Sequence, residues 1–152
     1  ACLAQLVNVI APIMTENGGG VFEQTIFYPI MHMSNNARGS VLLSKLDCDK
    51  HDSKEFTDVP DMDCIATIND AEDEIVLFCV NRCQGEDYEL NVKMLDADGF
   101  KLSEHIEMAG FKAQDGNNFV SAPVKPSQAA VNANSDSIHI KPFSWNVLRF
   151  KK

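Results

Sequence analysis

Gln24 is the residue whose position best suits contact with a ligand. It ends a predicted short strand, residues 21–24, which follows three consecutive glycines and precedes a predicted helix. Ligand-binding side chains of α/β proteins collect where strands end. The same pattern is also typical of a glutamine that only caps the following helix, so both interpretations stay open.

The other groups that could do chemistry have spacings that favour structural roles. Asp47, Asp49 and Asp52 lie at calcium-like spacing, but their segment lacks the glycine turn and final glutamate of an EF-hand loop, which favours a solvated turn. Cys79 and Cys83 have no second pair of ligands nearby for zinc. We predict no metal and no cofactor. Surface or capped positions are expected for the four scattered histidines: His32, His51, His105 and His139.

Charge and composition limit the classes of partner. The chain has 152 residues and a formal net charge of −9, which argues against nucleic acid and anionic membranes, because phosphate binding needs clustered Lys or Arg. No segment resembles a signal peptide, and the apolar run near the N-terminus is too short and too interrupted to span a bilayer. Five irregularly spaced cysteines are typical of reduced thiols in a cytosolic protein.

The first third of the chain predicts two helices around the short strand. A mostly buried helix is expected over residues 3–14, with a bend or early end at Pro12. A second helix is expected from Thr25, as N-cap, to about Ala37, with Pro29 in its first turn; a strand over 24–28 is the alternative. The first helix is predicted from apolar residues at three- and four-residue spacing: Leu3, Leu6, Val7, Ile10, Ile13 and Met14.

The remainder predicts short strands joined by polar turns. Residues 64–68 and 74–80 are expected to form a hairpin, and the second of these strands is apolar enough to be central and covered on both faces. A second hairpin is predicted between 87–94 and 101–108, with Gly99 in its turn. Strands are also expected at 41–46, 137–140 and 145–150, with Pro142 favouring a bend or an edge position between the last two.

Two sites in this part could be taken for ligand contacts. Trp145, the only tryptophan, lies among apolar strand residues, which favours a place in the core. Asn117 and Asn118 fall in a predicted long loop, residues 110–137, where a turn is the favoured interpretation.

The N-terminal residues carry a family resemblance. Residues 3–15, Leu-Ala-Gln-Leu-Val-Asn-Val-Ile-Ala-Pro-Ile-Met-Thr, precede the glycine turn and Gln-Thr-Ile-Phe-Tyr-Pro at 24–29. Together they resemble the last part of the catalytic barrel of family 51 α-L-arabinofuranosidases. The resemblance continues weakly in Phe-Cys-Val-Asn-Arg at 78–82 and in Phe-Ser-Trp-Asn-Val-Leu-Arg at 143–149, which match the family's closing strand.

The resemblance implies a mainly β chain: a C-terminal, jelly-roll-like β-sandwich, preceded by the last helix-strand-helix of a (β/α)8 barrel. Residues 1–38 are expected to be the remnant of that barrel, and 39–152 the sandwich. A complete barrel takes about 250 residues, so none fits here. The chain is thus expected to begin after the seventh barrel strand and to need a missing N-terminal barrel portion as partner.

The resemblance also implies retaining hydrolysis of terminal arabinofuranosyl groups. Such an enzyme needs two glutamates that flank the glycosidic bond, and no glutamate of this chain matches either family motif, so no catalytic residue is assigned. Gln24 matches a family glutamine that hydrogen-bonds the arabinose in the −1 subsite. The chain departs from the family just before it, with Phe22-Glu23 where Trp-Arg is common, and strand alternation predicts that Glu23 faces away.

Two other classes of function stay open. A stand-alone β-sandwich that binds carbohydrate is one, although aromatic residues make up only 8% of the chain and no row of exposed rings is evident. An assembly domain is the other, because enzymes of this family often form oligomers. We therefore expect a cytoplasmic protein that acts on arabinofuranosyl oligosaccharides together with the rest of its barrel, and that forms a homo-oligomer.

Overall fold

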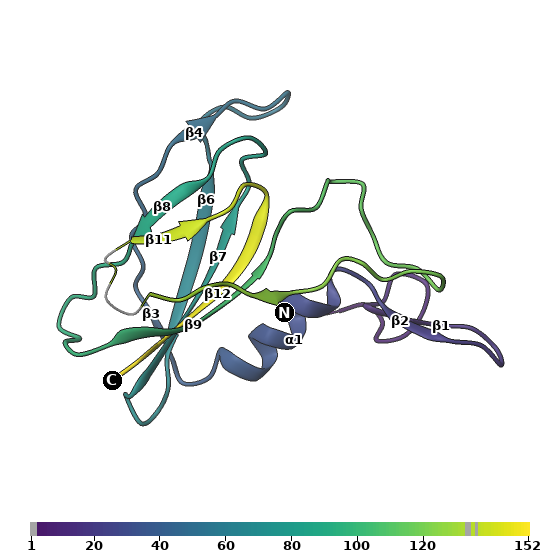
Figure 1. Cartoon of the computed structure of the whole chain (residues 1–152), viewed down its shortest axis with the longest axis horizontal. Coiled ribbons are helices and arrows are strands. Elements are labelled where there is room, and N and C mark those ends of the chain that lie inside the picture. The colour runs from purple at the N-terminus through teal and green to yellow at the C-terminus, as the bar shows by residue number, and fades with distance from the viewer. Residues whose placement is uncertain (1–2, 133–134, 136) are drawn as a thin grey trace.

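The computed structural model describes residues 3–132, 135 and 137–152. It is mainly β, as the sequence predicts (Figure 1). The elements in chain order are β1 (Ile13–Thr15), β2 (Val21–Glu23), α1 (Phe27–Asn36), β3 (Ser40–Leu42), β4 (Lys50–His51), β5 (Val59–Pro60), β6 (Met62–Ile68), β7 (Glu74–Asn81), β8 (Tyr88–Asn91), β9 (Lys101–Met108), β10 (Ser127–Gln128), β11 (Ser137–Ile140) and β12 (Ser144–Lys151).

A six-stranded antiparallel sheet forms the centre of the molecule. Its strand order is β10-β9-β12-β7-β6-β3. The predicted hairpin of β6 and β7 is confirmed, and so is the central place of β7, in which the five residues from Ile75 to Cys79 are all buried. The predicted bend between the last two strands is confirmed at Pro142 and Phe143; the alternative, an edge position, does not apply to β12, which lies between β9 and β7.

The β8–β11 pair covers one face of this sheet and completes a sandwich. Ile138 and Ile140 of β11 and the half-buried Tyr88 and Leu90 of β8 pack with the inner face of the six-stranded sheet. The predicted hairpin between 87–94 and 101–108 is wrong. Its strands have the expected alternation, but β8 pairs with β11 and β9 pairs with β12 and β10, and alternation alone does not select the partner of a strand.

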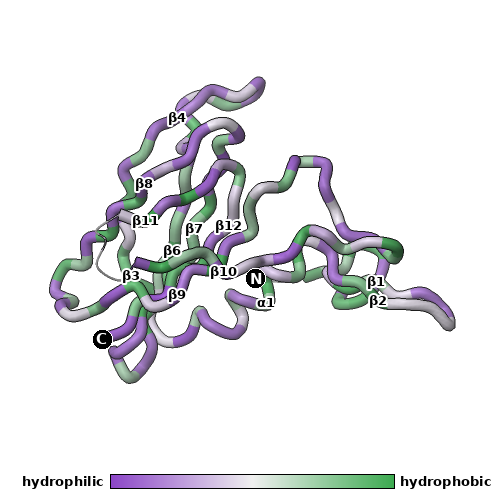
Figure 2. Tube along the Cα trace, viewed as in Figure 1, coloured by the Kyte–Doolittle hydropathy of each residue, from purple (hydrophilic) through white to green (hydrophobic). Residues whose placement is uncertain are grey.

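Helix α1 lies against the opposite face of the sheet (Figure 1). Trp145 is 9% exposed and packs there with Val76, Phe78 and Val147, which confirms its core position. The ring of His32 on α1 lies 5.4 Å from the Trp145 ring, centroid to centroid. Around Trp145 the sheet is therefore covered on both faces, whereas Ile65 and Val80 on the α1 side are 42% and 36% exposed. Figure 2 shows hydrophobic segments both on strands of the sheet, such as β7, and near the β1–β2 pair.

The predicted helix over residues 3–14 is wrong. The segment forms turns and then β1, with positive φ angles at Asn8 (63°) and Val9 (61°). The side chain of Asn8 accepts a 2.7 Å hydrogen bond from the backbone N–H of Thr15, and Pro12 has no N–H to give to the Asn8 carbonyl, which accepts from Ala11 instead. A local side-chain bond and a proline together outweigh the helical spacing of the apolar residues.

The second predicted helix is confirmed as α1, with Pro29 in its first turn. The alternative strand over 24–28 is excluded. Thr25 is not the cap: the residue at the N-cap is Ile26, and no side-chain hydrogen bond closes that end. After α1 the chain turns at Gly39 (φ 87°), where an added Cβ would lie 2.1 Å from the carbonyl oxygen of Ile68; only glycine fits there.

Candidate functional site

Gln24 lies directly after β2, as predicted, and is half-buried. Its backbone N–H donates to the carbonyl oxygen of Pro12 at 2.8 Å. Its side-chain Nε2 donates to the carbonyl oxygen of Ala11 at 2.5 Å. A carbonyl oxygen can only accept, so this contact fixes the orientation of the amide and leaves Oε1 as the acceptor that a ligand hydroxyl could use.

The segment around Gln24 is held by a loop that comes from the sandwich. Figure 1 shows the chain leaving β9, running out to the β1–β2 pair and returning as β10. Asn117 of this loop donates through Nδ2 to the carbonyl oxygen of Glu23 at 2.9 Å. The sequence favours a turn at Asn117; in the structure this side chain contacts a residue 94 positions away, for which the local sequence holds no signal.

Tyr28, in the first turn of α1, is the buried polar residue nearest in sequence to Gln24. It is 8% exposed, and its hydroxyl makes no hydrogen bond to a residue that the structure describes. Burial raises the pKa of Tyr28, and the negative charge of Glu23 adds to the rise. The nearby amide of Asn117 acts in the opposite direction and lowers the pKa of Tyr28, although it does not form a hydrogen bond with the hydroxyl. Tyr28 is therefore a neutral phenol at physiological pH.

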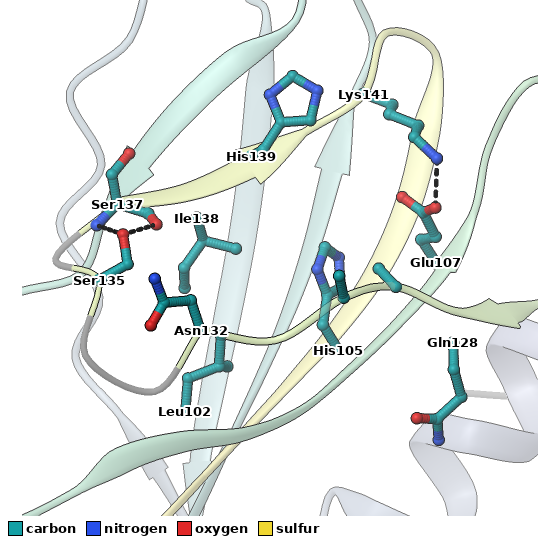
Figure 3. A pocket seen from close by; sticks show the side chains of 12 residues that line it. Leu102, His105, Glu107, Gln128, Asn132, Ser135, Ser137, Ile138, His139 and Lys141 are labelled. Carbon is teal, nitrogen blue, oxygen red and sulfur yellow. Dashed lines mark hydrogen bonds and ion pairs between the residues drawn. The ribbon is translucent and has the colours of Figure 1, made fainter.

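A cavity of about 480 Å³ lies between β9, the chain after β10, and β11 (Figure 3). His105, which is 2% exposed, points into it, and its Nε2 lies 3.0 Å from Oδ1 of Asn146. Of the two expected positions, surface or capped, His105 has the second: its ring is buried in the sandwich and is capped by the hydrogen bond to Asn146. The carboxylate of Glu107 pairs with the ammonium group of Lys141. The charged groups of this cavity thus neutralise one another.

A second cavity, of about 550 Å³, is lined by residues of the chain before β4 and of β8. Beside it the carboxylate of Asp61, a residue 5% exposed, accepts hydrogen bonds from the hydroxyl of Tyr88 and from Nδ1 of His51. These bonds, the Tyr88 bond first, hold the pKa of Asp61 below its usual range. The arrangement ties β4 and β8 to the start of β6. Neither cavity is lined by Gln24.

The segment with calcium-like spacing contains the short strand β4 (Lys50–His51). In residues 3–132, 135 and 137–152, no group of three His, Cys, Asp or Glu side chains is placed to hold a metal ion. No helix in those same ranges is long and apolar enough to cross a bilayer.

Comparison with known proteins assigns the family. The family model of the alpha-L-arabinofuranosidase C-terminal domain matches residues 1–144. The chain therefore belongs to this family of arabinofuranosidase C-terminal domains, and the predicted resemblance is confirmed.

Two curated relatives match over the whole chain. The chain is 41% identical to an intracellular exo-alpha-(1->5)-L-arabinofuranosidase of Halalkalibacterium halodurans, with 100% of this chain and 31% of that protein covered. It is 39% identical to intracellular exo-alpha-(1->5)-L-arabinofuranosidase 1 of Bacillus subtilis strain 168, with the same coverage. The chain thus spans about a third of the length of these relatives.

Solved structures show the same fold. A family 51 alpha-L-arabinofuranosidase from Bifidobacterium longum superposes with a TM-score of 0.89 at 26% identity, over 98% of this chain and 29% of that one. An alpha-L-arabinofuranosidase from Thermotoga maritima in complex with arabinose superposes with a TM-score of 0.80 at 18% identity, over 98% of this chain and 33% of that one. The predicted mainly β fold class with a C-terminal sandwich is confirmed.

Proposed function

We propose that this chain is the C-terminal part of a retaining α-L-arabinofuranosidase that removes terminal α-L-arabinofuranosyl residues from arabinan and arabinoxylan oligosaccharides. The family match and the names of the curated relatives support this assignment. Residues 1–38 would complete the catalytic barrel, and 39–152 would form the sandwich that braces it. The relatives named intracellular support a cytoplasmic enzyme.

The chemistry would come from the preceding barrel portion. Retaining hydrolysis needs a nucleophile and an acid/base carboxylate about 5 Å apart, and no glutamate of this chain matches the family motif for either. The chain alone is therefore expected to be inactive. The exposed apolar side chains near the N-terminus support a surface that another polypeptide covers, namely the barrel or a second copy: Leu6, Val9, Ile10 and Val21.

Gln24 is the one residue of this chain that we assign to the sugar. The observation that carries the assignment is the contact from its Nε2 to the Ala11 carbonyl. It holds the amide in one orientation and leaves Oε1 to accept a hydrogen bond from a hydroxyl of the arabinosyl group. A preorganised acceptor strengthens binding because it loses little conformational entropy when the sugar arrives.

Kinetics of the complete enzyme test this assignment. Gln24→Ala should lower kcat/KM for an aryl arabinofuranoside by roughly 1–3 kcal/mol of transition-state binding. Gln114→Ala is the matched control, because Gln114 is exposed in the sandwich loop, and it should leave kcat/KM unchanged. If Gln24→Ala also leaves kcat/KM unchanged, Gln24 is removed from the site.

A homo-oligomer is the second part of the proposal. The same exposed apolar side chains near the N-terminus support it. Light scattering on the 152-residue chain, in which these side chains are exposed, should give a mass that is a multiple of the monomer, and a monomeric profile at all concentrations would contradict it.

A further inference from the structure

The loop between β9 and β10 makes contacts with a segment outside the sandwich. Residues 109–126 leave the six-stranded sheet, reach the β1–β2 pair and return to the sheet (Figure 1). At its outer end the loop touches β2, the strand that ends immediately before Gln24. The contact therefore connects the sandwich with the strand that presents the proposed sugar-binding side chain.

One side chain of this loop, Asn117, makes three hydrogen bonds of 2.9 Å. Its Nδ2 donates both to the carbonyl oxygen of Glu23 and to that of Val124. Its Oδ1 accepts from the backbone N–H of Val124. Both N–H bonds and the oxygen of the amide are used, so the rotamer and the amide orientation of Asn117 are fixed by backbone groups of two separate segments.

Strand β2 needs such a contact because it has a single neighbour. Among the residues that the structure describes, it pairs with β1 only, over three residues, in a two-stranded sheet, and a pair of short strands is weakly stable by itself. Asn117 supplies an additional hydrogen bond at Glu23, one residue before Gln24. A second contact from the same loop is the edge-to-face packing of Phe119 on Phe22, with ring centroids 4.8 Å apart.

From these contacts we propose that Asn117 is a positioning residue, which holds β2 and through it sets the place of Gln24 at the sugar. The proposal rests on the proposed function for its catalytic consequence. Asn117 makes no contact with the sugar in this account. It acts by restricting the backbone from which the Gln24 amide projects, and small displacements of a positioned group cost activity.

Hydrogen exchange on the 152-residue chain tests the structural half of the proposal without any activity. In Asn117→Ala, the backbone amides of residues 21–25 should exchange about two- to tenfold faster, as expected for the loss of one hydrogen bond. Asn118→Ala is the matched control, since the Asn118 side chain accepts from the backbone N–H groups of Val120 and Ser121 in its own loop. Unchanged exchange at residues 21–25 in Asn117→Ala would overturn the proposal.

The conservative variant Asn117→Asp guards against a variant that does not fold. Aspartate has nearly the same shape and can still accept from the Val124 N–H, but its carboxylate cannot donate to the carbonyl oxygen of Glu23 or to that of Val124. It should therefore keep the loop closed while it accelerates exchange at residues 21–25. Normal exchange in a folded Asn117→Asp chain would again contradict the role of the Glu23 contact.

A double-mutant cycle in the complete enzyme tests the catalytic half. Asn117→Ala should lower kcat/KM about two- to tenfold. If it acts through Gln24, adding it to Gln24→Ala should cause little further loss. Fully additive effects would overturn the positioning role of Asn117. An unchanged kcat/KM in Gln24→Ala alone would instead count against the proposed function. In that case the exchange result decides whether Asn117 holds β2.

Discussion

Arg149, in the central strand β12, donates through Nη2 to Oδ1 of Asn36, the last residue of α1, at 2.8 Å. The same guanidinium donates through Nη1 to Glu74 at 2.6 Å and through Nε to Glu104 at 3.0 Å. It thus joins three strands of the sheet and the end of the helix. Since α1 begins three residues after Gln24, this cluster also connects the sheet with the segment that carries the candidate site.

Replacing Arg149 should destabilise the fold. Arg149→Met leaves Glu74 and Glu104 without their shared cation, and the side chains of all three are 20–29% exposed. We expect a loss of about 2–3 kcal/mol in the free energy of unfolding, below the figure for fully buried pairs because water screens this cluster in part. Urea denaturation measures the loss.

Lys151→Met is the control for that measurement. Lys151 also pairs with Glu74, at 3.4 Å, but its side chain is 56% exposed. Its replacement should change the free energy of unfolding by less than about 0.5 kcal/mol. Equal effects of the two substitutions would show that Arg149 has no special structural role.

Truncating the core of the sandwich should cost more. Leu148 is 0% exposed and packs in the cluster between the six-stranded sheet and the β8–β11 pair. Leu148→Ala should lower the free energy of unfolding by about 2–5 kcal/mol, because it leaves a cavity that close-packed neighbours cannot fill. Leu43→Ala, at a fully exposed leucine, should change it by less than about 0.5 kcal/mol. A small effect at Leu148 would contradict the two-sheet core.

The strands of the sheet were predictable where burial produces a run of apolar residues in the sequence. The apolar run of β7 predicted a central strand, and the Asn69 turn predicted its hairpin with β6. The sequence has no comparable pattern that shows which strands pair with each other, so the predicted pairing of 87–94 with 101–108 was wrong. The prediction of a helix over residues 3–14 was wrong for another reason. Val9 and Ile10 are 76% and 65% exposed, so their helical spacing does not report burial within this chain.

The candidate site was predictable only in part. The glycine turn and Pro29 placed Gln24 between a short strand and a helix, as the structure has it. Its hydrogen bond to Ala11 depends on the irregular path of residues 3–12, which periodicity did not predict. The Asn117 contact joins segments 94 residues apart, and no local propensity encodes it.

Asp61 should make stability depend on pH in the acid range. Hydrogen bonds from Tyr88 and His51 lower its pKa in the folded state, below about 3.9 in the unfolded chain. The stabilisation is therefore fully present above about pH 4 and is lost as the pH falls through the folded-state pKa. Asp61→Asn, measured by urea denaturation between pH 2.5 and 6, should lose stability less steeply below about pH 4 than the wild type.

Two further variants sharpen that experiment. Tyr88→Phe removes the bond with the largest effect on the Asp61 pKa and should also flatten the acid slope. Asp63→Asn, at a side chain 74% exposed, should keep the wild-type slope. A wild-type slope in both Asp61→Asn and Tyr88→Phe would contradict this account of the Asp61 carboxylate.

The most direct test of the central claim is a complementation assay with an aryl arabinofuranoside. The 152-residue chain is measured alone, and then after mixing with, or fusion to, the N-terminal part of a relative such as the Halalkalibacterium halodurans enzyme. The account predicts no turnover by the chain alone and clear arabinose release by the combined protein. Arabinose release by the purified chain alone would contradict it.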